Sequence, residues 1–382
     1  MTESGVPPRP IRVLHTPTTV GGNAPVLARA ERALGLESWC VSVRPDAYGR
    51  EVDEVLFRGR WDAPLLRVAR RAGLLVRAAT GYDVIHYNCG ETILPVPYVL
   101  PPAGPSAWRA LQERWSRAVG MRDLPLLKRL GLRVVVTYQG EEARLGDYCR
   151  AHFPIHWVHE VPDHYDPLLD ERKRAAMALF GRHADRIYSL NPDLLHVLPS
   201  GAEFLPYTPI DLAGWSPVPA RSGGDPVLVH APSHRGIKGT RWVLQAVERL
   251  KAEGLRFELV LVEGMSHAQA RREYERADLV IDQLLAGWYG GLAVEAMALG
   301  KPVVCYLREG DLGFLPAAMR EELPLIQATP ATIAEVLREW LGPRRRELGD
   351  VGRRGRSFVE RWHDPLRVAA RLKADYERLL AR

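Results

Sequence analysis

The sequence predicts an α/β protein with two domains, each built around a mostly parallel sheet. Short runs of Val, Ile and Leu recur along the chain, such as IRVLH, YDVIHY, RVVVTY, PVLVHA, FELVLV and PVVCYL. Nearly continuous apolar runs are typical of strands that are buried on both faces of a parallel sheet. Segments with helical periodicity alternate with these strands, which indicates repeated strand–helix units.

A stretch dense in proline and glycine, LPYTPIDLAGWSPVPARSGGDP, separates the predicted strands into two sets. It has no clear period and predicts an interdomain linker. We therefore expect an N-terminal Rossmann-like domain over residues 1–208 and a C-terminal Rossmann-like domain over residues 209–365. The amphipathic segment 366–382 is expected to form a helix that packs on either domain, including back on the first.

One helix of the second half is predicted in detail. In TRWVLQAVERLKAEG, the apolar residues from Trp242 to Leu250 fall on one stripe, and Gly254 is expected to end the helix. The amphipathic pattern predicts that this stripe packs on the sheet.

The composition limits the partners that we expect. The net charge of +6 fits an anionic partner such as a nucleotide, an acidic membrane or a nucleic acid, and it equally fits a solvated arginine-rich surface. The chain lacks an RNA-binding aromatic signature and a concentrated basic stripe, so a nucleic-acid partner is not expected.

The cysteines and the chain start point to the cytoplasm. The four cysteines are far apart and form no CxxC pair, which disfavours a zinc site or a redox pair. The start MTESGVPPRP lacks the features of a signal peptide, and no apolar run approaches the ~20 residues that span a bilayer. We expect a cytoplasmic protein.

Two basic segments are compatible with contact to the inner membrane face. WDAPLLRVARRAGLLVRAA mixes Trp61 and several leucines with arginines, and SAWRALQERWSRAVGMRDL has a similar pattern. Such a helix can lie on an anionic membrane, or it can bury its leucines in the core as an ordinary surface helix does.

A glycine turn in GWYGGLAVEAMALGKPVVCYL predicts a phosphate site. Gly290 and Gly291 permit backbone geometry that side chains forbid, and a helix from Leu292 to Leu299 is expected to follow. The first N–H groups of a helix carry partial positive charge and bind phosphate. Glu295, one turn into the helix, is placed to reach a ligand hydroxyl, or it is an ordinary solvated glutamate.

The loop HAPSHRGIKG follows a predicted strand and carries two cations, Arg235 and Lys238. Ligands of open α/β sheets bind at the carboxyl ends of the strands. Two cations at this edge can neutralise a diphosphate without a metal, although they can also be two solvated surface charges.

Other turns add candidate ligand groups. Gly21 and Gly22 precede a helix near the N-terminus, but the full GxGxxG fingerprint is missing, which argues against a dehydrogenase. Glu263 closes a strand where backbone groups can receive a nucleobase. Asp282 and Gln283 end the next strand and can address sugar hydroxyls, or they are ordinary polar residues of a turn.

Taken in order, these pieces resemble the retaining glycosyltransferases of family 4, which have the GT-B fold. The matching segments are RGIKG, ELVLVEG, YERADLVID, GWYGGLAVEAMALGKPVV and the tail FVERWHDPLRVAARLKADYERLL, over about residues 225–382. In the first half the resemblance rests on HTPTTVGGNAPVLARAERALG, YDVIHYN and VVVTYQG. It implies two Rossmann-like domains that face each other across a cleft.

The resemblance assigns roles to several residues. Lys238 matches the lysine that binds the donor diphosphate, Glu295 matches the second acid of the E-x7-E motif, which holds the ribose, and Gly22 matches the glycine loop under the diphosphate. Arg235 is assigned by its charge, because the family's usual arginine position falls at Pro232.

Two departures from the family pattern stand out. Gly287 occupies the position of the first acid, which usually contacts the donor sugar, so either Asp282 or Gln283 replaces that acid or the donor differs. Gln139 stands where the family often has histidine. Together with His86 and Asn88 it is expected in the acceptor or sugar cleft.

The implied activity is that of a hexosyltransferase, which moves a sugar from a nucleoside-diphosphate sugar, by default UDP, to an acceptor hydroxyl with retention of configuration. Lys238, Arg235 and helix-start amides would stabilise the leaving diphosphate. No DxD motif occurs, so neither a metal nor a further cofactor is expected. The acceptor is a glycan, a lipid-linked sugar or a small molecule, and the oligomeric state is open.

Two other functions fit the same architecture. One is a nucleotide-sugar 2-epimerase, and the other is a nucleotide-sugar-binding pseudoenzyme, which the glycine at position 287 motivates.

Overall fold

The computed structural model describes residues 9–46, 49, 51–57, 64–94, 119–219, 221 and 223–382. Its contacts divide the chain into two compact units. The first contains Met1–Thr137, Ala176–Tyr188 and Pro365–Arg382, and the second contains Tyr138–Ala175 and Ser189–Asp364. The contacts therefore assign residues 138–175 to the second unit. The domain boundary that the sequence predicts at residue 208 stays a prediction.

The first sheet has the strand order β3-β2-β1-β4-β5-β6-β7. Its pairs β1–β2, β1–β4, β2–β3 and β4–β5 are parallel. All five residues of the strand from Val84 to Asn88 are buried, as the run YDVIHY predicts. The strands are β1 (Arg12–Thr16), β2 (Glu37–Ser42), β3 (Glu54–Val55), β4 (Val84–Asn88), β5 (Arg133–Tyr138), β6 (Arg186–Ser189) and β7 (Glu203–Phe204).

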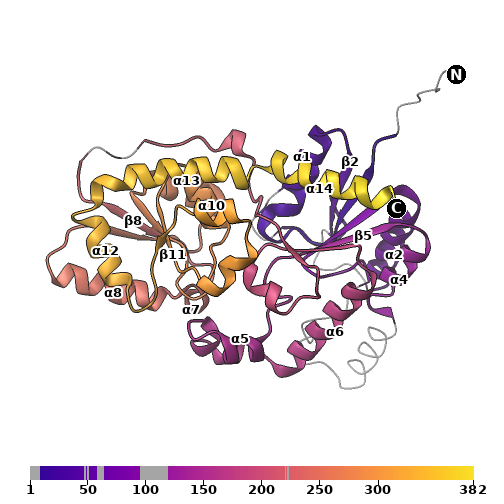
Figure 1. The fold of residues 1–382 in the computed structure, drawn as a ribbon, viewed down its shortest axis with the longest axis horizontal. Coiled ribbons are helices and arrows are strands. Elements are labelled where there is room, and N and C mark those ends of the chain that lie inside the picture. The colour runs from indigo at the N-terminus through magenta and orange to yellow at the C-terminus, as the bar shows by residue number, and fades with distance from the viewer. Residues whose placement is uncertain are drawn as a thin grey trace. The chain divides into compact units, whose positions relative to one another are not determined.

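The C-terminal helix α14 (Pro365–Leu380) belongs to the first unit and lies beside α1 (Asn23–Ala33) (Figure 1). The hydroxyl of Tyr376 donates to Glu31 Oε1 at 3.1 Å, and Lys373 Nζ donates to the carbonyl of Leu34 at 2.8 Å. Both contacts join residues more than 300 positions apart in the sequence, so α14 stabilises the packing of α1. The other helices that contribute to this unit are α2 (Pro64–Gly81), α4 (Asp123–Arg129) and part of α6 (Pro167–His183).

The basic helix α2 combines buried and exposed apolar residues. Leu74 is buried, while Leu66, Val68 and Val76 are exposed. Trp61 and the side chain of Leu65 lie outside the described residues, as does most of the second basic segment. Among the described residues, no helix has both the length and the apolar character that crossing a bilayer requires. Contact with the membrane surface stays a prediction.

The second sheet has the strand order β12-β11-β10-β8-β9, and all four pairs are parallel. The sequence prediction of an α/β fold with parallel strands is therefore confirmed for both sheets. The strands are β8 (Val227–His230), β9 (Glu258–Leu261), β10 (Leu279–Ile281), β11 (Val303–Cys305) and β12 (Ile326–Gln327).

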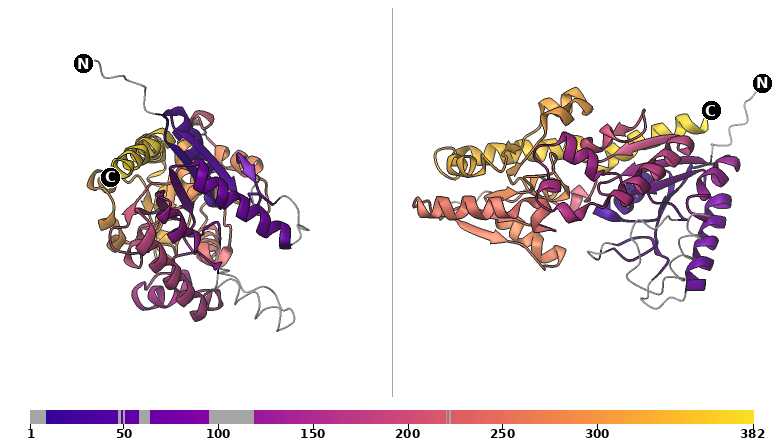
Figure 2. Two further views of the ribbon diagram at one scale, coloured as in Figure 1. Left: turned by 90° about the vertical axis from the view of Figure 1, so that its right-hand side faces the viewer. Right: turned by 90° about the horizontal axis from the view of Figure 1, so that it is seen from below.

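Helices cover both faces of this second sheet. Leu228 faces a core formed with α8 (Thr240–Ala252) and α12 (Ile333–Leu341), while its neighbours in the strand face α9 (His267–Arg276), α10 (Gly291–Ala298) and α13 (Leu348–Trp362). Figure 1 shows α8 and α13 on opposite sides of the strands β8 and β11, and Figure 2 gives two further views of the same ribbon. Alternate side chains of each strand enter different cores, so a continuous apolar run is needed.

The detailed helix prediction is confirmed. In α8 the residues Val243, Ala246, Val247 and Leu250 are buried, and Gly254 follows the helix with a φ of 88°. A positive φ favours glycine, which explains why the helix stops there.

Residues 138–175 join the second unit because their apolar side chains pack there. Phe153 and Trp157 form a buried cluster with Leu285 and Ala286, and the short helix α5 (Gly146–His152) supplies Cys149 to it. Burial raises the pKa of the Cys149 thiol to about 12, so this cysteine acts as a small core residue.

Candidate functional site

Arg235 and Lys238 lie at the carboxyl edge of the second sheet, as the sequence predicts. After strand β8 the side chain of His234 caps the short helix α7 (Arg235–Lys238) by accepting from the backbone N–H of Ile237 at 3.3 Å. Gly239 then turns the chain into α8 with a φ of 76°. A side chain at that turn would be strained, so the glycine allows α7 to end at Lys238.

Lys238 meets two other predicted site residues. Its Nζ atom lies 3.2 Å from Asp282 Oδ1 and donates to Gln283 Oε1 at 2.6 Å. The side chain of Lys238 is 15% exposed and that of Asp282 is fully buried. Gln283 is itself held, because its amide donates to the carbonyl of Trp288. Residues that the sequence analysis assigned to phosphate and to sugar therefore form one polar cluster.

The start of helix α10 closes this cluster. The backbone N–H of Gly290 donates to Asp282 Oδ2 at 2.6 Å. Gly290 has a φ of −110°, which other residues also adopt, and Gly291 is not among the residues with positive φ. The expectation that this turn needs geometry forbidden to side chains is thus wrong. What the turn supplies is an N–H group close to a lysine and a carboxylate.

Glu295 is buried in α10 and has a histidine partner. It is 5% exposed, and a hydrogen bond joins its Oε1 atom to His267 Nε2 at 2.9 Å. His267 begins α9, where Ser266 and Gln269 form a capping box. His267 was not predicted from the sequence, although the capping pattern Ser-x-x-Gln that contains it is visible there. The alternative of a solvated glutamate does not match this burial.

Arg235 and Glu263 are paired with each other. Arg235 Nε and Nη2 donate to the two oxygens of Glu263 at 2.7 and 2.5 Å. Arg235 is mostly exposed, so water screens this ion pair and it adds little stability. The guanidinium has five N–H donors, so this pair does not use all of its capacity to donate.

An arginine fills the space beside Gly287, the position of the missing acid. A Cβ atom at Gly287 would lie 2.6 Å from Arg308 Cζ, and the φ of Gly287 is 78°. Arg308 stacks on Phe153 at 3.6 Å and donates to Asp311 Oδ2 at 2.7 Å. Burial raises the pKa of Asp311, and His196 Nε2 lies 2.9 Å from its other oxygen. Here the sequence motif Arg-x-x-Asp was the missed signal.

Gln139 lies in the second unit and is also nearly buried. Its backbone N–H donates to Glu142, and its carbonyl accepts from Asn191 Nδ2. The hydroxyl of Tyr207 in turn donates to Asn191 Oδ1 at 2.6 Å. These contacts fix the backbone around Gln139, and its expected role toward a sugar stays a prediction.

Three predicted residues belong to the first unit. Gly22 precedes α1 with a φ of 76°, which requires glycine or a strained residue. His86 is fully buried, with Nδ1 2.7 Å from the Tyr376 hydroxyl and Nε2 2.7 Å from Thr137 Oγ1. Both ring nitrogens are thus engaged within the unit. Asn88 is buried and donates to the carbonyl of His86 at 3.2 Å.

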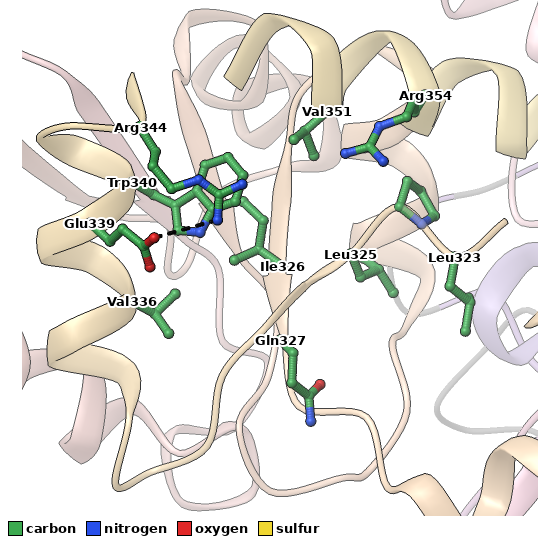
Figure 3. A pocket seen from close by; sticks show the side chains of 11 residues that line it. Leu323, Leu325, Ile326, Gln327, Val336, Glu339, Trp340, Arg344, Val351 and Arg354 are labelled. Atoms are coloured by element: carbon green, nitrogen blue, oxygen red, sulfur yellow. Dashed lines mark hydrogen bonds and ion pairs between the residues drawn. The ribbon is translucent and has the colours of Figure 1, made fainter. Parts of the chain in front are cut away.

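The second unit also contains a pocket of about 340 Å³ that involves none of the predicted residues (Figure 3). Arg344 stacks on Trp340 at 3.9 Å inside it and is paired with Glu339 and Glu347. Because none of the residues that the sequence predicts for the donor lines this pocket, we place the candidate site at Lys238 rather than here. The lining residues are Leu323, Pro324, Leu325, Ile326, Gln327, Val336, Glu339, Trp340, Arg344, Val351 and Arg354.

No protein-family description and no curated protein matches the chain. Solved structures do share its fold over nearly the whole length. Sucrose-phosphate synthase from Thermosynechococcus elongatus has a TM-score of 0.60 at 16% identity and covers 98% of this chain and 100% of its own. The catalytic domain of starch synthase IV from Arabidopsis thaliana, bound to ADP and acarbose, has a TM-score of 0.58 at 11% identity with coverages of 98% and 100%.

A third similar structure is HepE from Anabaena in complex with UDP-glucose. Its TM-score is 0.56 at 12% identity, and it covers 96% of this chain and 99% of its own. The predicted GT-B fold class is therefore confirmed. Identities this low show the fold alone, so the activity has to be argued from the site.

Proposed function

We propose that this protein is a glycosyltransferase that uses a nucleoside-diphosphate sugar. The observation that carries the proposal is the cluster at the start of α10, where Lys238 and the N–H of Gly290 converge on one carboxylate. An ammonium and a helix-start amide are the groups that bind a phosphate. The GT-B fold, which solved structures with ADP or UDP-glucose also have, supports this proposal.

In the proposed reaction the diphosphate is the leaving group. As the bond between the sugar and the phosphate breaks, negative charge develops on the phosphate oxygens, and Lys238 and the amides of α10 stabilise it. Arg235, from the same short helix α7, adds a second cation. We propose that the configuration is retained, that the donor is UDP-linked, and that no metal is required.

Glu295 is proposed to hold the ribose. It lies in α10 one turn after Gly290, and His267 orients its carboxylate through the 2.9 Å contact. A carboxylate that is fixed in this way can accept hydrogen bonds from hydroxyl groups of the ribose.

The acceptor, the cellular location and the surface contacts are finer proposals. We propose that the acceptor is a glycan, a lipid-linked sugar or a small molecule, and that the protein acts in the cytoplasm, with peripheral contact to the inner membrane face. These parts rest on the sequence analysis alone.

Titration calorimetry with UDP, GDP, ADP and inorganic pyrophosphate tests the proposed function. Wild-type protein should bind at least one nucleoside diphosphate, and Lys238→Ala should weaken that binding by at least about tenfold, since a charge-assisted contact is lost. Lys251→Ala removes the same charge from the far end of α8 and should leave the affinity unchanged. Retention of the wild-type affinity in Lys238→Ala would contradict the assignment.

Product analysis with and without an acceptor distinguishes the two alternative functions from a transferase. Incubation with the nucleotide sugar alone should give an epimer if the protein is a 2-epimerase. Binding without turnover across a broad panel of acceptors would favour a pseudoenzyme. A transferase forms a glycosylated product only when an acceptor is present.

A further inference from the structure

The carboxylate of Asp282 interacts with the two groups that we assign to the donor phosphate, the ammonium of Lys238 and the backbone N–H of Gly290. One oxygen, Oδ1, lies 3.2 Å from Lys238 Nζ, and the other, Oδ2, accepts from the N–H of Gly290 at 2.6 Å. Asp282 is fully buried, so it interacts with these groups away from bulk water. Each oxygen is thus matched to a different donor, one cationic and one from the backbone.

This arrangement has the chemistry of a bound phosphate. A phosphate also presents several acceptor oxygens on one centre, and it binds best where a cation and a helix-start amide converge. A buried carboxylate is costly unless it is paired and hydrogen-bonded, so Asp282 depends on these two donors. A diphosphate and Asp282 therefore compete for the same two groups.

The neighbouring residues allow the exchange. Lys238 also donates to Gln283 Oε1 at 2.6 Å, and Gln283 is fixed by its bond to the carbonyl of Trp288. Lys238 thus keeps one neutral partner when it moves away from Asp282. A Cβ atom at Gly290 would lie 3.5 Å from Lys238 Nζ and 3.6 Å from Asp282 Oδ2, so the glycine keeps the space beside both groups open.

We propose that Asp282 is an internal stand-in for the donor phosphate. It holds Lys238 and the N–H of Gly290 in place when no nucleotide is bound, and it gives them up when the diphosphate enters. This competition lowers the affinity for the diphosphate. In return, the site is preformed before the nucleotide binds, and the nucleoside diphosphate is released faster. This inference rests on the proposed function, and it makes Asp282 a positioning residue rather than a group that touches the sugar.

The test compares Asp282→Asn with the wild-type protein by calorimetry, using UDP and inorganic pyrophosphate as probes. The amide has the shape of the carboxylate and keeps one acceptor oxygen, but it no longer competes as an anion. We expect Asp282→Asn to bind both probes at least about tenfold more tightly. Glu253→Gln, an equal charge change at an exposed site on the same unit, should not alter either affinity.

The outcomes separate this inference from the proposed function. If the wild type binds UDP and folded Asp282→Asn binds it no more tightly, the stand-in role is wrong and the proposed function is untouched. If neither protein binds any nucleoside diphosphate, the proposed function fails and the inference fails with it. In the double variant Lys238→Ala/Asp282→Asn the gain over Lys238→Ala should be smaller, because only the N–H of Gly290 is then left to compete for.

A measurement on the wild type covers the case in which Asp282→Asn does not fold. In a crystal structure with UDP, Lys238 Nζ and the N–H of Gly290 should contact phosphate oxygens and lie beyond hydrogen-bond distance of Asp282. Both bonds to Asp282 surviving in the presence of a bound diphosphate would overturn the inference.

Discussion

At the scale of single residues, Gly287 and Arg308 form a matched pair. The guanidinium lies where a side chain at position 287 would begin, and the backbone N–H of Arg308 donates to the carbonyl of Gly287 at 2.8 Å. Arg308 is also fixed by Asp311 and by its stacking on Phe153. An acid cannot be restored at position 287 without displacing this arginine from a buried carboxylate.

We predict that Gly287→Ala destabilises the protein more than Gly254→Ala does. Both glycines have positive φ, 78° and 88°, but only Gly287 has a neighbour within 4 Å of the added Cβ. Gly254→Ala should cost about 1 kcal/mol from the backbone alone, and Gly287→Ala about 2 kcal/mol more from overpacking against Arg308. Urea unfolding measures both, and equal costs would show that Arg308 moves aside freely.

We predict that Glu295→Gln weakens the binding of UDP but not of pyrophosphate. The loss of a charged acceptor for the ribose should reduce UDP affinity by about tenfold, whereas pyrophosphate lacks the ribose. Glu248→Gln, on the exposed side of α8, is the control for the change in charge. Calorimetry decides between a ribose contact and a structural role, since a structural role would weaken both ligands.

At the scale of elements, the C-terminal helix α14 is tied to the first sheet through buried polar groups. The Tyr376 hydroxyl lies between His86 and Glu31, and Glu31 also accepts from Ser38 Oγ at 2.6 Å. His15 Nε2 lies 2.9 Å from the same carboxylate oxygen. Because these partners come from distant parts of the chain, the network fixes where α14 packs.

We predict that Tyr376→Phe destabilises the protein by about 1–3 kcal/mol, since buried groups lose a hydrogen-bonding partner. Tyr82→Phe removes a hydroxyl from the same unit outside this network and should cost less. The difference is read from urea unfolding curves. A Tyr376→Phe protein as stable as the wild type would mean that packing alone holds α14.

At the scale of the whole molecule, buried histidines make the fold sensitive to acid. Burial lowers the pKa of His230 and of His363 to about 4, and it lowers the pKa of His86 well below its usual value. In the unfolded chain a histidine has a pKa of about 6.5. Between those values the unfolded state binds a proton that the native state excludes, so stability falls as the pH falls.

We predict that His363→Gln flattens this pH dependence. Each such histidine costs about 1.4 kcal/mol of stability per pH unit between pH 6.5 and its folded pKa. Between pH 7 and pH 5 the variant should therefore lose about 2 kcal/mol less than the wild type does. Asp123 and Asp311, whose pKa burial raises, act in the opposite direction, so the comparison of two proteins is more informative than one curve.

The sequence alone was sufficient for the fold class and for much of the second unit. Continuous apolar runs predicted both parallel sheets, and the stripe from Val243 to Leu250 predicted the buried face of α8. These features are local, because strand and helix periodicity are written in consecutive residues. The position of Lys238 after strand β8 and the helix position of Glu295 follow from the same local patterns.

Only the tertiary structure decided what those residues contact. Asp282 and Gly290 meet, and so do Glu295 and His267, across loops and helices whose packing no local pattern specifies. Arg308 fills the space at Gly287 and stacks on Phe153. Phe153 comes from residues 138–175, which belong to the second unit and pack there against Leu285. Such pairings depend on side chains that are distant in sequence, and their energies come from burial that exists only once the chain has folded.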